Sequence, residues 1–187
     1  MEAVAWLAGE EHSAYPTCVC PVVANFVREL NDGLPDDATR TRLLTPLLAR
    51  LVGSCATPTM KRRRALLAAD WVVRHLSPTE LGAMGLHPEA SRLRELAPVA
   101  NATSALRALR TAHQVRVASG FVVPAAVLWA LEEILRGDSV QAAHRAAEAT
   151  TRWLSEPGAE RRAATLAIDL VEQMLALRIA GTDAPDT

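Results

Sequence analysis

The stretch "PTMKRRRALLAADWVVRHL", residues 58–76, decides the fold. Its apolar residues do not alternate as they would in a half-buried strand; placed on a helix, they cover most of its circumference. A helix that is apolar on nearly all sides must be enclosed by other elements. We therefore expect residues 58–76 to form the central, most enclosed helix of an all-helical protein.

Helix signals follow one another on both sides of this stretch, with short gaps between them. Capping residues such as Asn101 and Asp138 stand at predicted starts, and glycines such as Gly33 and Gly137 stand at predicted ends. These signals predict further helices at about residues 21–31, 35–53, 77–85, 87–96, 102–119, 125–136, 140–156 and 159–180. Nothing in the chain resembles a strand.

Two local patterns predict details of these helices. Pro46 lies inside the helix predicted at residues 35–53, and it removes a backbone donor, so we expect a kink or a break near Thr45. Ser77, Pro78 and Glu80 match the residue types of an N-cap, a first turn and a capping box. They predict that a new helix begins at Ser77.

Composition supports a compact helical bundle. The chain of 187 residues contains 35 alanines and only three isoleucines, and alanine has the highest helix propensity. We expect an all-α bundle of eight to nine helices without a β-sheet. We also expect one domain over residues 1–187, with possible subregions at 1–97 and 101–180 and a disordered tail at 181–187.

Charge and targeting signals limit the kinds of partner that the chain would attract and the cellular location that we expect for it. The chain has 19 arginines, a single lysine (Lys61) and a formal net charge of −1, so no overall field attracts nucleic acid or an anionic membrane. The arginine and alanine bias is typical of a GC-rich bacterial genome. Because the start lacks the cations of a secretory signal and no apolar run reaches about 18 residues, we expect a cytoplasmic protein with free thiols and no membrane segment.

The stretch "HSAYPTCVCPVV", residues 12–23, holds two of the three cysteines. Pro21 in a first helical turn would place Cys20 at the N-cap, where free amide groups lower a thiol pKa. One hypothesis is therefore a redox enzyme or sensor with Cys20 as the nucleophile and Cys18 as the resolving thiol. A second is a thiolate-rich metal site, with ligands from His12, Cys18, Cys20 and Cys55. A third is ordinary apolar packing of both cysteines, which needs neither metal nor cofactor.

Four consecutive cations, Lys61, Arg62, Arg63 and Arg64, stand at the start of the central helix; we call them the basic cluster. Cations are unfavourable at the positive end of the helix dipole, so some compensation is expected. Acidic residues elsewhere in the fold, an acidic protein partner, or an anion such as a phosphate or nucleic acid would each provide it. Nucleic acid is disfavoured because no aromatic residue interleaves with the cluster.

Asp70 and Arg74 lie four residues apart on the same helix. This spacing predicts a structural ion pair that is partly withdrawn from water. Trp71, beside it, is expected in the core.

The chain lacks the motifs of common enzyme classes. It has no phosphate-binding glycine loop, no nucleophile elbow, no Glu-x-x-His pair and no His-Glu-x-x-His. We therefore expect a non-enzymatic helical interaction domain that binds another protein, as an adaptor, a regulator or an immunity-type neutralising partner in a bacterial cytoplasm. One or two of Trp6, Trp71, Trp129 and Trp153 would then be exposed anchors, and a homo-oligomer is compatible with this function.

Overall fold

The computed structural model describes residues 1–177, and these residues are helical without any strand. The predicted all-α bundle is confirmed. In chain order the elements are α1 (Glu2–Leu7), α2 (Pro21–Gly33), α3 (Asp37–Leu51), α4 (Pro58–Trp71), the π-helical turn η1 (Val72–Leu76), α5 (Ser77–Ala83), α6 (His87–Arg94), α7 (Ala102–Ala118), α8 (Ala125–Arg136), α9 (Ser139–Leu154) and α10 (Glu160–Ala176). Because α4, η1 and α5 are continuous, residues 1–177 form nine separate helices. The tail predicted at 181–187, and residues 178–180 of the last predicted helix, lie outside the described residues.

The helices begin where side-chain caps are available. Asn101 accepts a hydrogen bond from the backbone N–H of Ser104 and starts α7. Asp138 accepts from the N–H groups of Val140 and Gln141 and starts α9. Each cap satisfies backbone donors that have no partner inside the helix. Both of these predicted helix starts are present.

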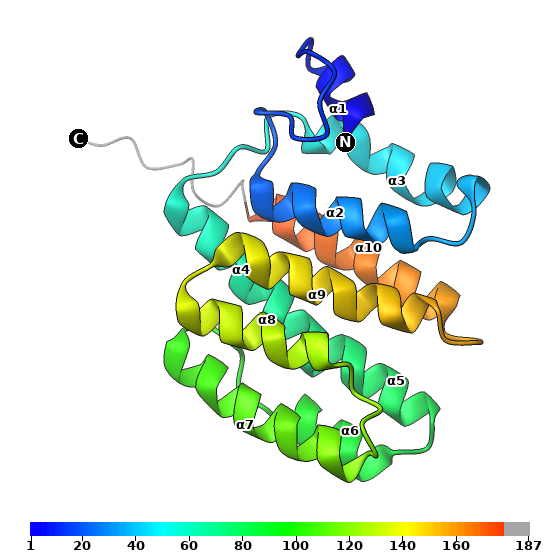
Figure 1. The fold of residues 1–187 in the computed structure, drawn as a ribbon, viewed down its shortest axis with the longest axis vertical. Helices are drawn as coiled ribbons and strands as arrows, with labels where there is room; N and C mark the ends of the chain where they lie inside the picture. Colours follow the sequence, from blue (N-terminus) through cyan, green and yellow to red (C-terminus); the bar gives the residue numbers. More distant parts are fainter. Residues whose placement is uncertain (178–187) are drawn as a thin grey trace.

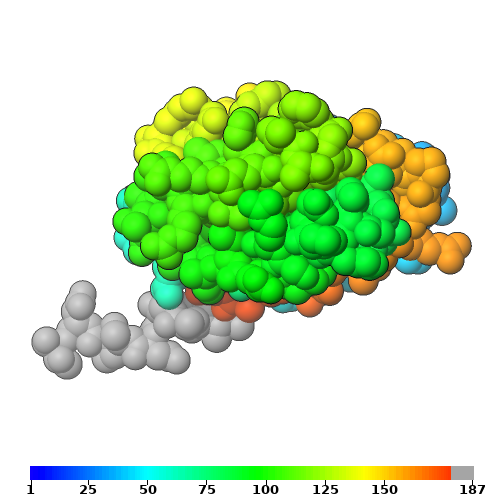
Figure 2. Space-filling view, turned by 90° about the horizontal axis from the view of Figure 1, so that it is seen from below, coloured from blue at the N-terminus to red at the C-terminus, as the bar shows by residue number. Residues whose placement is uncertain are grey.

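The helices are arranged in two layers (Figure 1). In one layer α2, α9, α8 and α7 lie side by side, with contacts between each neighbouring pair. The other layer contains α3, α10, α4, η1, α5 and α6. Contacts of α2 with α10, of α9 and α8 with α4, and of α7 with α6 join the layers. The short helix α1 projects at one end, beside α3, and α6 and α7 cover the opposite end (Figure 2).

One connected core lies between the layers. Buried apolar side chains from Val4 to Leu175 belong to a single cluster, which includes residues from both predicted subregions. Most residues of α4 from Arg64 onward are buried, and Trp71 packs edge-on against Phe26 with ring centroids 6.4 Å apart. The central position expected for residues 58–76 agrees with this burial.

Small residues allow α2 and α9 to approach closely. The inner face of α9 consists largely of alanine, with Ala142, Ala143, Ala146, Ala147 and Ala149 all buried. At the end of α2, a β-carbon added to Gly33 would lie only 2.4 Å from Cγ2 of Thr151. Any residue with a β-carbon at position 33 would overlap Thr151 of α9. Gly33 therefore permits the close approach of the two helices, in addition to ending α2.

The break that was one of two outcomes expected near Thr45 is absent, because α3 continues through Pro46; a kink there stays a prediction. The helix start predicted at Ser77 differs from the structure. Ser77 does not cap a new helix, because the chain passes from α4 through η1 into α5 without leaving helical geometry. The Ser77 hydroxyl instead donates 2.6 Å to the carbonyl oxygen of Val72, and Glu80 accepts from Arg162 of α10 at 2.7 Å. Glu80 is buried, so this long-range pair replaces the predicted capping box.

Candidate functional site

Cys20 stands at the N-cap of α2, as predicted, but its side chain is fully buried. Its backbone N–H donates to the hydroxyl of Ser54 at 3.2 Å, which ties the start of α2 to the loop before α4. A nucleophilic thiol must be accessible to its substrate. The burial of Cys20 removes the exposure on which the hypothesis of a Cys20 nucleophile depends, and it agrees with apolar packing.

Cys18 and Cys55 lie in adjacent loops. The N–H of Cys55 donates to the carbonyl oxygen of Cys18 at 3.2 Å, and the Cys55 thiol donates to the carbonyl oxygen of Thr17 at 2.6 Å. Cys55 is exposed and Cys18 is half-buried. Burial, together with the neighbouring Glu10 carboxylate, raises the pKa of the Cys18 thiol, although a backbone hydrogen bond from Gly53 opposes the rise.

The four proposed metal ligands do not converge. The Nε2 atom of His12 lies 3.4 Å from Oε2 of Glu2, at the exposed N-terminal end of the chain. Within residues 1–177, no group of three or more His, Cys, Asp or Glu side chains is placed to hold a metal ion. The arrangement therefore offers no support for the metal site proposed at His12, Cys18, Cys20 and Cys55.

The basic cluster is divided between surface and core. Arg62 and Arg63 are exposed and Lys61 is half-buried, whereas Arg64 is 0 % exposed. Arg64 Nε donates to the carbonyl oxygen of Met174 at 2.9 Å, and Nη1 donates to that of Ser54 at 2.8 Å. Consecutive helical residues point about 100° apart, so one of four must face the core of an enclosed helix. Arg64 therefore belongs to the scaffold, and it is not available to an acidic partner or an anion.

Asp70 and Arg74 form an ion pair with a separation of 3.1 Å, and both side chains are largely buried. Asp70 also accepts a hydrogen bond of 2.7 Å from the backbone N–H of Val99. This second contact fastens the segment between α6 and α7 to α4. The pair has the structural position that its spacing predicts.

A wide cleft lies away from all of these predicted residues. It has a volume of about 890 Å³ and opens between the C-terminal halves of α2 and α9, the start of α8 and the loop between α7 and α8. Its aromatic lining comes from Phe121, Trp129 and Trp153, with Met84 beside them. We call it the aromatic cleft. Trp129 is 41 % exposed, while Trp153 is almost fully buried.

Phe121 has an unusual conformation at the edge of the aromatic cleft. The residue is 62 % exposed and its φ is +68°, a left-handed value found in no other non-glycine residue of the described chain. Arg116 holds it there: the guanidinium donates to the carbonyl oxygens of Phe121 and Val123 and lies 5.0 Å from the centre of the Phe121 ring. A left-handed backbone costs a non-glycine residue about 1–2 kcal/mol, so the surrounding contacts must maintain it.

The electrostatic environment of the aromatic cleft is acidic. Glu29, Asp32, Glu148 and Glu156 line it, against two cations, Arg116 and Arg152. The helices α2, α7 and α9 also direct their C-terminal ends toward it, and those ends carry partial negative charge. Glu156 is paired with Arg152 at 3.0 Å, and Glu29 lies 3.2 Å from His144. Asp32 has no cationic partner within the described residues.

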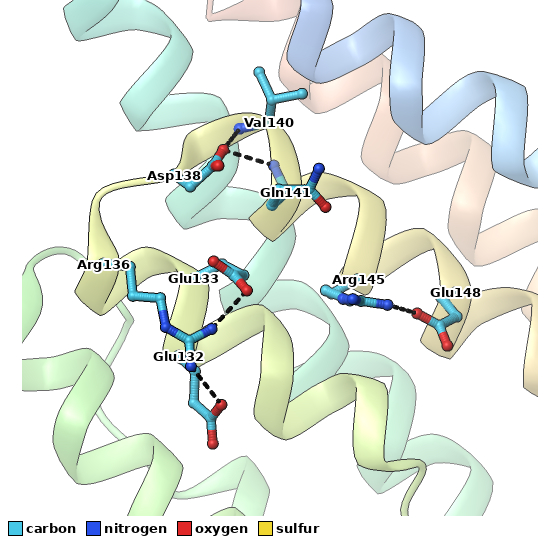
Figure 3. Close-up of polar contacts among 8 residues, drawn as sticks. All are labelled: Glu132, Glu133, Arg136, Asp138, Val140, Gln141, Arg145 and Glu148. Carbon is cyan, nitrogen blue, oxygen red and sulfur yellow. Dashed lines mark hydrogen bonds and ion pairs between the residues drawn. The ribbon is translucent and has the colours of Figure 1, made fainter.

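The polar contacts drawn in Figure 3 lie within α8, within α9 or at the start of α9. Arg145 of α9 donates to Glu148 at 2.7 Å and also lies 5.1 Å from the centre of the Trp129 ring on α8. At the far end of α8, Arg136 contacts both Glu132 and Glu133. Of these contacts, the one between Arg145 and the Trp129 ring joins α9 to α8, and it places Trp129 beside the Arg145–Glu148 pair.

Sequence reasoning identified Trp129 as a possible anchor but missed the cleft itself. Its walls come from segments between about residues 29 and 156, and no local spacing brings them together. Of the four tryptophans, Trp6 and Trp129 are exposed, and Trp71 and Trp153 are buried.

Comparisons with known proteins give no relative: no protein family, curated protein or solved structure matches this chain. Every helix in residues 1–177 is too short or too polar to cross a membrane.

Proposed function

We propose that this protein is a non-enzymatic interaction domain that binds a partner protein in the aromatic cleft. The observation that carries the proposal is Phe121, an exposed aromatic side chain held in a left-handed conformation at the edge of the cleft. Strained backbone of this kind persists where the surrounding structure enforces it, and it clusters at binding sites. A solvent-exposed phenylalanine contributes little to folding, so a role in binding gives a reason for its placement.

Trp129 and Met84 extend the apolar surface beside Phe121. Both are exposed, and together the three side chains offer the kind of anchor that dominates protein interfaces. Arg116 and Arg145, each placed over one of the aromatic rings, restrict ring motion before a partner arrives. A surface fixed in this way loses less conformational freedom on binding.

The charge of the cleft favours a basic partner segment. Asp32 and Glu29 lie at the end of α2, where the helix dipole adds to their negative charge. A partner segment with an apolar side chain against Trp129 and a lysine or arginine beside Asp32 would complement both features. This differs from the acidic partner expected for the basic cluster, of which Arg64 lies in the core.

The biological setting remains part of the proposal. The arginine and alanine bias supports a bacterial source, and the small number of cysteines, three in the chain, supports a reducing cytoplasm. An adaptor, a regulator and an immunity-type neutralising protein would all use such a surface.

Affinity capture tests the proposal. The purified protein is immobilised and exposed to extract from its native host, alongside the variants Phe121→Ala and Trp129→Ala. Leu106→Ala is the matched control, because Leu106 is an exposed apolar residue of α7 that does not line the cleft.

We expect a protein that is retained by the wild type and by Leu106→Ala but lost by at least tenfold from both cleft variants. Retention of the same proteins by all four forms would contradict the proposal. A measured turnover that depends on Cys20 would favour the enzymatic alternative.

A further inference from the structure

Two loops place Cys18 and Cys55 next to each other. The hydrogen bond of 3.2 Å from the Cys55 N–H to the Cys18 carbonyl oxygen limits the separation of their Cα atoms. With standard bond lengths, that separation cannot exceed about 7 Å. Disulfides join cysteines whose Cα atoms are about 4.4–6.8 Å apart. The backbone therefore already holds the two residues close to the range that a disulfide requires.

We propose that Cys18 and Cys55 form a reversible disulfide when the protein meets a small-molecule disulfide such as glutathione disulfide. This pairing replaces the one that the Cys-x-Cys spacing suggested, between Cys18 and Cys20. Cys20 is fully buried and its backbone is fixed to Ser54, whereas Cys55 is exposed on the neighbouring loop.

The disulfide would form in two steps, and Cys55 reacts first because it is the more exposed of the two cysteines. The Cys55 thiolate attacks one sulfur of glutathione disulfide, forms a mixed disulfide and releases one glutathione thiolate. The Cys18 thiolate then attacks the Cys55 sulfur, forms the internal disulfide and releases the second glutathione thiolate. Two protein thiols are oxidised and one glutathione disulfide is reduced to two glutathione molecules, which take up the two protons.

A small pocket gives the oxidant access. Cys55 lines a cavity of about 410 Å³ together with Tyr15, Thr17 and Lys61. Lys61 has no ion-pair partner within residues 1–177, and as a lining residue of this cavity it brings a positive charge that would attract a carboxylate of glutathione. Lys61 therefore acquires a role that is separate from the exposed arginines of the basic cluster.

The disulfide would connect the N-terminal segment to the start of α4. In the reduced protein, residues 10–20 are held to this region by hydrogen bonds and by the apolar packing of Val19 and Cys20. A disulfide that closes the loop from Cys18 to Cys55 restricts the unfolded chain and raises the thermal midpoint of unfolding.

Disulfide mapping of the 187-residue chain tests the inference. The protein is incubated with glutathione disulfide or with dithiothreitol, remaining thiols are alkylated under denaturing conditions, and unreduced peptides are analysed by mass spectrometry. We expect Cys55 linked to the peptide that contains Cys18 and Cys20, with one free thiol left. The thermal midpoint should rise on oxidation.

Matched variants assign the partner. Cys20→Ser should retain the cross-link, whereas Cys18→Ser should stop at the mixed disulfide on Cys55. A link between Cys18 and Cys20, or wild-type protein that stops at glutathionylated Cys55, would overturn the inference. Lys61→Gln should slow the first step several-fold at low salt; an unchanged rate would remove the role given to Lys61. These outcomes are independent of partner binding in the aromatic cleft.

Discussion

Arg64 donates a hydrogen bond of 2.9 Å to the carbonyl oxygen of Met174, 110 residues further along the chain. Met174 lies in the last described turn of α10, where backbone carbonyls commonly accept hydrogen bonds from outside their own helix. The same guanidinium binds the carbonyl oxygen of Ser54. One fully buried side chain thus caps α10 and anchors the loop before α4, and within residues 1–177 it has no carboxylate partner.

Replacement of Arg64 by alanine should therefore destabilise the fold. We expect the free energy of unfolding to fall by about 3 kcal/mol, because two buried carbonyl groups lose their donors and a cavity remains. Urea unfolding followed by tryptophan fluorescence measures the change. The control is Arg62→Ala, at an exposed position of the same cluster, for which a change within about 0.5 kcal/mol is expected. Equal effects of the two substitutions would show that the Arg64 contacts contribute nothing.

The contact between Gly33 and Thr151 predicts a coupled pair. Gly33→Ala should lower the free energy of unfolding by about 1–3 kcal/mol, because its β-carbon would overlap the Thr151 side chain. Thr151→Ala in the same chain should recover part of the loss, since it removes Cγ2 but leaves Cβ, which lies 2.7 Å from the added carbon. A double-mutant cycle measures the coupling energy. Strictly additive effects would be incompatible with this contact.

Phe121→Gly should separate stability from binding. Glycine adopts a left-handed backbone without steric cost, so the substitution should raise the free energy of unfolding by about 1 kcal/mol. The same substitution removes the exposed ring and should weaken partner capture. Thermal unfolding and affinity capture on one protein sample measure both effects. A loss of stability would mean that the Phe121 ring contributes more to the fold than its exposure indicates.

Acid should release the N-terminal segment. Glu10 accepts hydrogen bonds from the N–H groups of Thr17 and Cys18 and from the Thr17 hydroxyl. Led by the Thr17 N–H, these bonds lower the pKa of Glu10 below its ordinary value of 4.5. Because the folded-state pKa is depressed, the stabilisation is fully present above pH 4.5 and is lost as the pH falls through the folded-state value.

Hydrogen exchange at the Thr17 and Cys18 amides measures this release. Both amides should be protected at pH 7, and their protection should fall relative to that of core amides in acid. Glu10→Gln should weaken protection already at pH 7, whereas Glu11→Gln, at the exposed neighbouring position, should not. Protection that is unchanged in Glu10→Gln would contradict the role assigned to this carboxylate.

The sequence predicted those features that depend on neighbouring residues. Asn101 and Asp138 cap helices through groups two or three residues away, and Gly137 ends α8 with a left-handed φ of 85°. Such interactions follow from local geometry, so their patterns are readable in the chain. The all-helical class follows from the same signals, repeated along the chain.

Long-range partners explain what the sequence did not predict. Glu80 has the spacing of a capping residue but accepts a hydrogen bond from Arg162, 82 residues away. Arg64 has the spacing of a surface cation but donates to a backbone carbonyl at the end of α10. Phe121 follows Gly120, an ordinary helix-ending glycine, and its own left-handed φ depends on the Arg116 side chain. For Glu80 and Arg64 the partner is chosen by packing of distant helices, which no local pattern contains; for Phe121 the partner is near in sequence, but the pattern of residues does not predict the contact.

The π-helical turn η1 has a consequence for the tolerance of the chain to insertion and deletion. A π turn contains one residue more than an α-helical turn. Deletion of one residue within Val72–Leu76 would turn η1 into an α-helical turn and leave the rotational phase of the residues after it nearly unchanged, because the extra residue lies within that one turn. Glu80 would then still face Arg162, and Leu81 would stay in the core. A deletion in the regular parts of the same rod would instead rotate everything after it by about 100°, so η1 should be the segment of this rod that best tolerates the loss of one residue.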